Sequence, residues 1–258
     1  MFWWVLLGIG LTAATAAYGF ARKLGLMALV DLIWTGGLGL AAAAYYLLEG
    51  SDGVRPLLVL AVVGFWSFRL SYHLLKDRVL PGREDPRYAN LARRWGARAA
   101  RNFLGVFWVQ VPFVMLFLVP VAAAMRHGGP LQWTDALAVC IAFGALAGEA
   151  VADRQLARFR SRPENKGEVC REGLWRYSRH PNYFFEWLHW WAYVAFAWGS
   201  PEVWPALAGP VSMYVFLRFI TGVPPAEYSS LRSRGEAYRD YQRTTNAFFP
   251  WKPHKPDS

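Results

Sequence analysis

The chain has 258 residues, of which 55% are hydrophobic and 17% aromatic, whereas soluble domains are usually about 45–50% apolar. Its formal net charge of +10 fits either a nucleic-acid-binding protein or a membrane protein with basic loops. The two cysteines, Cys140 and Cys170, form no CxxC pair, which excludes a disulfide framework or a cysteine-based metal site.

Seven stretches are apolar enough to cross a bilayer, which takes about 20 mostly apolar residues. The first lacks the positive leader of a secretory signal, so we interpret it as a retained span. The sequence therefore predicts an all-α, polytopic membrane helix bundle with seven transmembrane helices. The expected spans are 2–20, 26–48, 55–75, 103–125, 131–153, 183–199 and 202–220.

The cations are sorted between alternate connections. Of the 28 Lys and Arg residues, all but four lie in the odd-numbered connections or the C-terminal tail. Cytoplasmic loops carry such an excess, so we expect the N-terminus outside and the C-terminus in the cytoplasm. The distribution of the cations by membrane side excludes nucleic-acid binding, which would need a basic surface on a soluble domain.

We expect a single membrane domain over 1–258, with substrate-side helices in 1–125, a cofactor-binding half with cytoplasmic loops in 126–251 and a flexible tail at 252–258.

Several polar side chains fall within the expected second and third spans. A charge at mid-bilayer costs about 2.5–3.5 kcal/mol, so such residues face a cavity or one another. Asp31 lies early in the second span, and Arg69, Tyr72 and His73 share one face of the third. Asp31 and Arg69 could form an ion pair that either locks two helices together or lines a substrate cavity.

Two acidic residues end the expected fifth span. Glu149 and Asp153 are four residues apart, a spacing at which like charges repel. The following segment "RQLARFRSR" supplies cations. A structural salt-bridge cluster and a role in a site both fit this pattern.

The segment "GLWRYSRHPNYFFEWLHWW" joins a basic loop to an apolar helix. After Pro181, which favours a helix start, Asn182, Glu186 and His189 fall on one stripe. Arginine binds phosphate bidentately, and a helix N-terminus adds N–H donors for an anion. The pattern predicts a site for a phosphorylated cofactor, although a buried hydrogen-bond ladder and an ordinary positive-inside loop fit as well. The cations of the adjoining loop are Lys166, Arg171, Arg176, Arg179 and His180.

The C-terminal tail is too polar to span a membrane and too aromatic to be disordered. We expect it to fold back over the mouth of the site, with Tyr238 and Tyr241 on one face. Glu227 and Arg234 belong to the same segment. The terminal "AFFPW" is expected to anchor at the interface.

Three segments resemble the steroid 5-alpha-reductase family, and more closely its large bacterial branch of membrane proteins. They are "GEAVADRQLARFRSRPENKGEVCREG", "GLWRYSRHPNYFFEW" and "RSRGEAYRDYQRTTNAFFPW". Sterol delta-14 reductases and isoprenylcysteine and phospholipid N-methyltransferases share a looser form of the RHPxY motif. The resemblance is specific over about 149–251. It implies a reductase of the bacterial inner membrane that holds NADPH in its cytoplasmic half and delivers hydride to an enone.

By position, the resemblance implies that Asn182 and Glu186 hold the nicotinamide end of the cofactor. The steroid enzymes polarise the substrate carbonyl with a Gln-Glu pair and a Tyr, whereas this chain offers Asp31 alone in "VDLIW" and Tyr72 in "WSFRLSYH". The catalytic candidates are therefore Asp31, Tyr72 and Arg69. The candidate cofactor-binding residues are Glu149, Asp153, Arg160, Lys166, Arg171, Tyr177, Arg179, His180, Asn182, Glu186, Glu227, Tyr228, Arg234, Tyr238 and Tyr241.

Three functions remain open. The first is an NADPH-dependent reductase acting on a lipophilic small molecule such as a steroid or another lipid. The second is a methyltransferase that uses S-adenosylmethionine, and the third is a non-catalytic lipid-binding membrane protein of the same fold. The crowd of arginines favours the first, because NADPH carries three phosphates and S-adenosylmethionine none. The histidines lack metal-ligand spacing, so we expect no metal, and the sequence identifies no protein partner.

Overall fold

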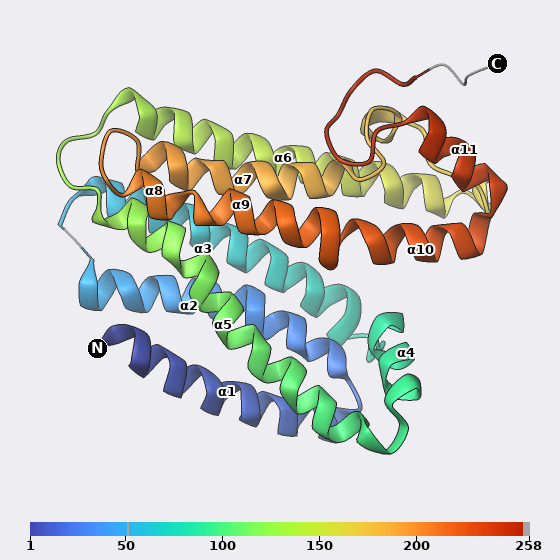
Figure 1. Ribbon diagram of the computed structural model, residues 1–258, viewed down its shortest axis with the longest axis horizontal. Coiled ribbons are helices and arrows are strands. Elements are labelled where there is room, and N and C mark those ends of the chain that lie inside the picture. The colour runs from blue at the N-terminus through green and yellow to red at the C-terminus, as the bar shows by residue number, and fades with distance from the viewer. Residues whose placement is uncertain (51, 255–258) are drawn as a thin grey trace. The chain divides into compact units, whose positions relative to one another are not determined.

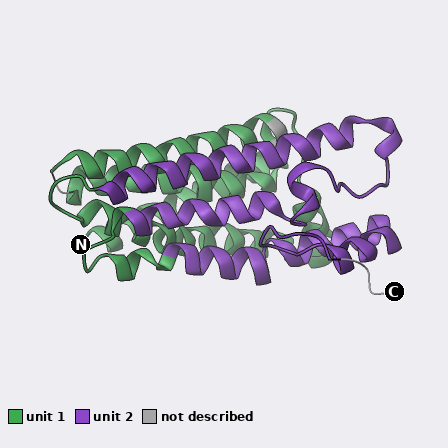
Figure 2. Ribbon diagram, turned by 90° about the horizontal axis from the view of Figure 1, so that it is seen from above, with its two compact units in different colours: residues 1–132, 196–208 green, residues 133–195, 209–258 purple. Residues whose placement is uncertain are grey.

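The computed structural model describes residues 1–50 and 52–254, with the backbone alone at 77 and 78. Within these residues every regular element is a helix, which confirms the all-α prediction. The chain divides into two compact units, coloured separately in Figure 2, and each is described on its own below. Unit 1 consists of residues 1–132 and 196–208, and unit 2 of residues 133–195 and 209–258. The single membrane domain expected over residues 1–258 would include both units, and it stays a prediction.

Six helical segments among the described residues are long and apolar enough to cross a membrane, which confirms a polytopic membrane protein. They correspond to six of the seven expected spans. The segments are Phe2–Leu24, Met27–Glu49, Val54–Leu74, Pro86–Arg126, Trp133–Ser161 and Val203–Arg234.

The helix at the expected span 183–199 is shorter than the others. Helix α7 (Pro181–Phe196) has 16 residues, about 24 Å at 1.5 Å per residue, whereas the hydrocarbon core is about 30 Å thick. The chain turns directly after it, where Gly199 has a φ of 84° that favours glycine. The seventh span and the orientation of the termini therefore stay predictions.

Unit 1 is built around four long helices, and α2 packs between α3 and α5 while α1 packs on α5 (Figure 1). Close approach depends on small residues: a Cβ added at Gly39 would lie 2.3 Å from Ser67 Oγ. Ser67 donates a hydrogen bond of 2.7 Å from α3 to the carbonyl of Thr35 in α2. The elements of unit 1 are α1 (Phe2–Leu24), η1 (Met27–Leu29), α2 (Val30–Glu49), α3 (Val54–Leu74), η2 (Leu75–Val79), α4 (Pro86–Trp95), η3 (Gly96–Arg98), α5 (Ala99–Arg126) and α8 (Val203–Ala206).

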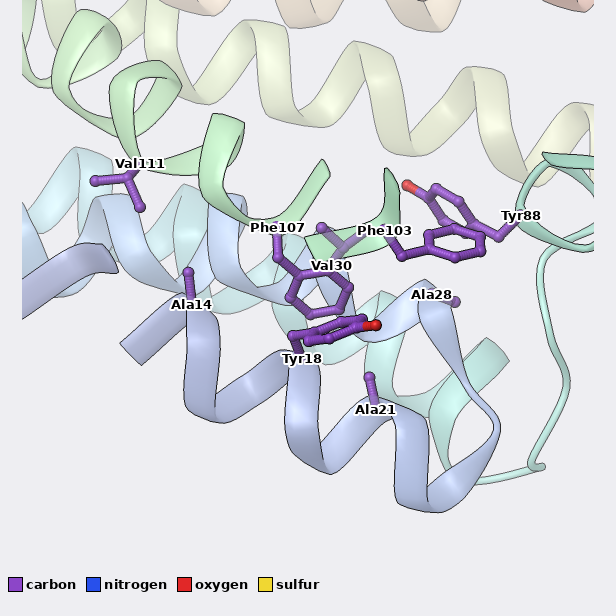
Figure 3. Close-up of a cluster of buried hydrophobic side chains, with 9 residues drawn as sticks. All are labelled: Ala14, Tyr18, Ala21, Ala28, Val30, Tyr88, Phe103, Phe107 and Val111. Atoms are coloured by element: carbon purple, nitrogen blue, oxygen red, sulfur yellow. The ribbon is translucent and has the colours of Figure 1, made fainter. Parts of the chain in front are cut away.

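A cluster of buried apolar side chains joins α1, α4 and α5 at one end of unit 1 (Figure 3). Tyr18 of α1 meets the ring of Phe107 edge to face, with centroids 5.5 Å apart. Tyr88 of α4 packs on Phe103 of α5 in the same way, at 6.3 Å. This cluster fixes α4 against the ends of the long helices.

Helix α4 lies within 76–101, which the sequence analysis took for a connection. Its start has local causes: the Asp85 side chain accepts a hydrogen bond of 2.8 Å from Arg87 N, and Pro86 occupies the first turn. Both are standard helix-start features. The helix turns Tyr88 and Trp95 toward the core and leaves Arg93 exposed, so it is amphipathic.

Polar contacts bind residues 196–208 to the N-terminal part of unit 1. Arg126, at the end of α5, forms an ion pair of 2.6 Å with Glu202. His127 Nδ1 lies 2.7 Å from the carbonyl of Phe196. Buried Arg55 donates to the carbonyls of His127 and Gly128 at 2.8 and 2.9 Å, and so fixes the loop that follows α5.

In unit 2, α7 packs against both α6 and α9. A Cβ at Gly148 of α6 would lie 2.4 Å from the Phe185 ring of α7, so these helices approach closely at that point. Trp187 of α7 donates a hydrogen bond of 3.0 Å to the carbonyl of Pro210 in α9. The elements of unit 2 are α6 (Trp133–Ser161), η4 (Pro163–Asn165), η5 (Gly173–Arg176), α7, α9 (Ala208–Val215), the π-helical turn η6 (Phe216–Ile220), α10 (Val223–Arg234) and α11 (Glu236–Thr244).

Candidate functional site

The C-terminal segment of unit 2 is bound to the loop that precedes α7, as the sequence analysis expected. Arg179 N donates to the carbonyl of Asn246 at 2.9 Å, and Trp251 N donates to the carbonyl of Tyr177 at 2.9 Å. Ser178 Oγ donates to the carbonyl of Phe248 at 2.9 Å. Of the tail expected to be flexible at 252–258, the last residues lie outside the described ones, while His254 N still donates to the carbonyl of Thr244 at 2.8 Å.

Glu227 binds three side chains at the junction of this loop with α10 and α11. Its Oε1 accepts from Arg179 Nε at 2.7 Å and lies 3.3 Å from His180 Nε2, and its Oε2 accepts from Gln242 Nε2 at 2.7 Å. The Arg179 and Glu227 side chains are 10% and 15% exposed. Because a carboxylate only accepts, His180 donates from Nε2. Through Glu227, Arg179 and His180 therefore bind α10 to the loop.

Arg171 and Tyr241 form a second contact between the loop and α11. Arg171 Nη2 binds Asp240 Oδ2 at 2.7 Å, and its guanidinium lies 5.4 Å from the centroid of the Tyr241 ring. The Tyr241 hydroxyl donates to the carbonyls of Trp175 and Ser178. Tyr241 is therefore a buried structural residue, whereas the Arg171 side chain is partly exposed.

Two further arginines from the candidate set lie within electrostatic range of each other. Arg160, in the last turn of α6, feels the positive charge of Arg234, at the end of α10. Arg234 donates from Nε to the carbonyl of Glu168 at 2.8 Å. Within the described part of the chain neither guanidinium forms an ion pair. This end of unit 2 therefore holds two neighbouring cations whose charges are open to an anion.

The outer rim of the same end is basic and aromatic. Lys166 and Arg176 are exposed. Tyr177 is exposed as well, and its backbone carbonyl is the one bound by Trp251. Tyr228 is 65% exposed, with the Arg232 guanidinium 5.9 Å from its ring centroid.

The expected polar stripe joins α6 and α7. Asn182 Nδ2 donates to Asp153 Oδ1 at 3.2 Å, so the two candidates from different segments meet. Glu186 Oε1 accepts from Trp190 Nε1 at 3.3 Å. His189 Nε2 lies 3.0 Å from the Tyr193 hydroxyl. Glu149, the other acidic candidate of α6, is also buried.

The catalytic candidates all lie in unit 1. Asp31 accepts from the Tyr88 hydroxyl at 2.6 Å and from Arg87 Nη2 at 3.1 Å, so α4 supplies both of these partners. Tyr72, expected as a possible hydroxyl partner of Asp31, is 54% exposed and stacks on Phe68 at 6.1 Å. The ion pair between Asp31 and Arg69 stays a prediction.

Several hydrogen-bond partners of the candidate residues were not predicted from the sequence. They are Tyr88, which binds Asp31, Asp240, which binds Arg171, and Gln242, which binds Glu227. Tyr88 was missed because its segment was taken for a loop, although the Asp-Pro pair before it favours a helix start. Asp240 and Gln242 lie on α11, where only the tyrosines were considered. The alternation of buried Tyr238, Tyr241 and Thr244 with these polar residues could have indicated which side of α11 faces the loop.

Burial shifts the acidity of groups in the loop and α11. It raises the pKa of Tyr238 to about 12 and also raises the pKa of the Cys170 thiol. Burial lowers the pKa of His180 below its usual 6.5, even though Glu227 opposes the shift. At neutral pH, therefore, His180 is neutral and Tyr238 protonated. The described residues include no cluster of three or more His, Cys, Asp or Glu side chains suited to a metal ion.

The fold and these contacts define an all-helical membrane protein whose second unit carries an arginine-rich end. Residues 17–245 match the profile of a family described as a protein of unknown function (DUF1295), and the chain belongs to this family. Neither the curated proteins nor the solved structures contain a significant match.

Proposed function

We propose that this protein is a membrane-embedded reductase that uses NADPH to reduce an activated C=C bond, an enone, in a lipophilic substrate. Its family is associated with steroid 5-alpha-reductase-like proteins, in agreement with the resemblance of the "RYSRHPNYFFEW" region. The proposal includes seven spans in a bacterial inner membrane, the N-terminus outside and the mouth of the site facing the cytoplasm.

The observation that carries this proposal is the positive end of unit 2, where Arg160 in the last turn of α6 lies within electrostatic range of Arg234 in the last turn of α10. Among the described residues, Arg234 donates to two neutral acceptors, the Glu168 carbonyl and the Ser233 hydroxyl. A polyanion stabilises two neighbouring positive charges of this kind. The exposed residues Arg171 and Lys166, in the loop between α6 and α7, add positive charge to unit 2. The donor set therefore favours the phosphates of a dinucleotide over S-adenosylmethionine, which has no phosphate.

The polar stripe of α7 is the second part of the proposed site. Bound NADPH supplies the hydride. Asn182, held by Asp153 at 3.2 Å, and Glu186, held by Trp190 at 3.3 Å, have fixed side chains that would orient the carboxamide end of the cofactor. Arg179 and His180 act as positioning residues, because Arg179 Nε donates to Glu227, His180 Nε2 lies beside the same carboxylate, and Arg179 Nη1 donates to the carbonyls of Gln242 and Thr245.

The candidates expected from the sequence for the carbonyl end of the substrate lie in unit 1. Asp31, Arg69 and Tyr72 remain these candidates. Asp31 already accepts hydrogen bonds from Tyr88 and Arg87. Among the other two candidates, the Tyr72 hydroxyl could donate a proton to the substrate, whereas the guanidinium of Arg69 stays protonated and could only donate hydrogen bonds.

Ligand-dependent stability of the purified protein tests the proposal. A ligand that binds only the folded state raises its stability by RT ln(1 + [L]/Kd). We expect NADPH to raise the melting temperature more than NADH does, and S-adenosylmethionine to leave it unchanged. A shift with S-adenosylmethionine alone would support the methyltransferase, and no shift with any of the three would contradict both enzyme functions.

Matched variants locate the phosphate site. Arg160→Gln and Arg234→Gln should each weaken NADPH binding about tenfold, the loss of roughly one charge-assisted hydrogen bond. Arg158→Gln, an exposed cation in the same last turn of α6, is the control and should bind as the unchanged protein does. Equal weakening in all three would indicate a general charge effect and contradict the assigned site.

A further inference from the structure

Unit 1 contains a cavity of about 380 Å³ at the end of α1, α4 and α5. This volume lies in the range of small-molecule and lipid sites, about 300–1,000 Å³. Aromatic rings and alanines form most of its wall, and one cation stands among them. The lining includes Tyr18, Arg22, Tyr88, Ala92, Ala99 and Phe103, of which Figure 3 shows Tyr18, Tyr88 and Phe103 from three different helices.

Arg22 is the cationic residue that lines this cavity. Its guanidinium lies 5.8 Å from the centroid of the Tyr18 ring, the side chain is exposed, and it forms no ion pair within the described residues. Lys23 follows it directly, and Arg98 and Arg101 flank the lining residues Ala99 and Ala100. The mouth is therefore cationic.

One carboxylate, Glu84, also lines the cavity. Both of its oxygens accept hydrogen bonds from backbone N–H groups. Its Oε2 accepts from Met27 N at 2.5 Å, and its Oε1 accepts from Ala28 N at 3.0 Å and Asp85 N at 2.8 Å. These donors include the N–H groups that begin η1, where a negative charge is favoured. Glu84 thus closes the turn between α1 and α2, and it leaves Arg22 available to another anion.

The amphipathic character of α4 favours a position of this cavity at the membrane surface. The helix turns Tyr88, Leu91 and Trp95 toward the core of unit 1 and exposes Arg93 and Arg94. A short helix with a basic face and an apolar face, next to the end of a membrane span, lies in the interfacial plane. Anionic lipid headgroups gather at such basic segments.

We propose that this cavity binds an anionic phospholipid, with the phosphate at Arg22 and one acyl chain between α1, α4 and α5. The apolar wall matches the chain, and the cationic mouth matches the head. The proposal stands on the geometry of unit 1 and is independent of the reductase function.

Stabilisation by defined lipids tests this site in the full-length protein purified in detergent. Phosphatidylglycerol should raise the melting temperature more than phosphatidylcholine with the same acyl chains, and soluble glycerol phosphate should have no effect. Equal stabilisation by both lipids would contradict the charge-selective site. Stabilisation by glycerol phosphate alone would show a simple phosphate site and also overturn the proposal.

Two variant pairs separate the cavity from the surface around it. Arg22→Gln should weaken the apparent affinity for phosphatidylglycerol about fivefold, as expected for one arginine at a membrane surface, whereas Arg94→Gln on the exposed face of α4 should have a smaller effect. Ala92→Leu fills the cavity and should also weaken binding, whereas Ala97→Leu, exposed in η3, should not. Identical losses within both pairs would overturn the proposal, and circular dichroism checks that each variant is folded.

Discussion

At the residue scale, the carboxylate of Glu227 joins three segments of unit 2. It binds Arg179 from the loop before α7 and Gln242 from α11, while itself belonging to α10. Buried ion pairs rarely add much net stability, but removing one partner is costly because the other charge stays buried. Glu227 is therefore one of the side chains that bind the C-terminal helices to the loop.

We expect Glu227→Ala to destabilise the protein by about 3 kcal/mol, since it leaves Arg179 buried with only carbonyl acceptors. Thermal unfolding of the purified protein measures this change. Glu236→Ala is the matched control: Glu236 also binds two arginines, Arg239 and Arg243, but it is exposed. A loss of stability in the control as large as that in Glu227→Ala would argue against the assigned role.

His180 gives the stability of unit 2 a pH dependence. Burial lowers its pKa below 6.5 in the folded protein, so below about pH 6.5 the unfolded chain binds more protons than the folded one. The free energy of unfolding should fall as the pH drops from 7 to 5.5. In His180→Gln, which keeps a neutral donor, melting temperatures over this range should change less. An unchanged slope would assign the dependence to other groups.

The site residues could be predicted only in part. Asp153 and Asn182 were both expected in the cofactor site, and their side chains are hydrogen-bonded. The helical spacing of polar residues in the sequence was enough to indicate them. The partners of Arg179 and Asp31 could not be predicted, since they come from helices 48 and 57 residues away in sequence. Residue type indicates that a buried charge needs a partner, but only the packed fold decides which one it meets.

At the element scale, the helices are held by close approaches at glycine and by short amphipathic helices beside the spans. The expected spans match six observed apolar segments because about 20 consecutive apolar residues are a strong pattern. Helix α4 was missed because ten residues with a mixed charge pattern also fit a loop. The break in the last long segment has local causes as well: Thr221 and Gly222 follow the π-helical turn η6.

The close packing of α6 on α7 can be tested at Gly148. We expect Gly148→Ala to destabilise the protein by about 1–3 kcal/mol, because the added methyl group would overlap the Phe185 ring and force it to move. Gly144→Ala, one turn earlier with open space around its Cβ, should be neutral or stabilising by about 0.5–1 kcal/mol. Thermal unfolding of the two variants compares them, and equal stabilities would contradict the close approach.

At the scale of the whole molecule, each unit has a distinct task in the proposals made above. Unit 2 carries the arginine-rich end and the polar stripe, and unit 1 carries Asp31 and the cavity beside α4. The charge pattern along the chain predicts a membrane orientation, because all but four of the 28 cations lie in the odd-numbered connections or the tail.

Cysteine labelling in intact cells tests this orientation. In a background with Cys140→Ser and Cys170→Ser, a membrane-impermeant maleimide should label Asp52→Cys, in the connection between α2 and α3, from outside. Ala97→Cys, between α4 and α5, should be labelled only after permeabilisation. The opposite pattern would invert the orientation and place the arginine-rich end on the wrong side for a cytosolic cofactor.

The long sequence separation between Arg179 and Glu227 also has a consequence for biogenesis. The carboxylate follows the arginine by 48 residues, so at about 5–20 residues per second the nascent chain exposes this cation for roughly 2–10 s before its counter-charge is made. A chain that terminates early, before Glu227, never acquires that counter-charge. Such a product would keep the docking surface of α10 and α11 uncovered, and cellular proteases could then distinguish incomplete copies from finished ones.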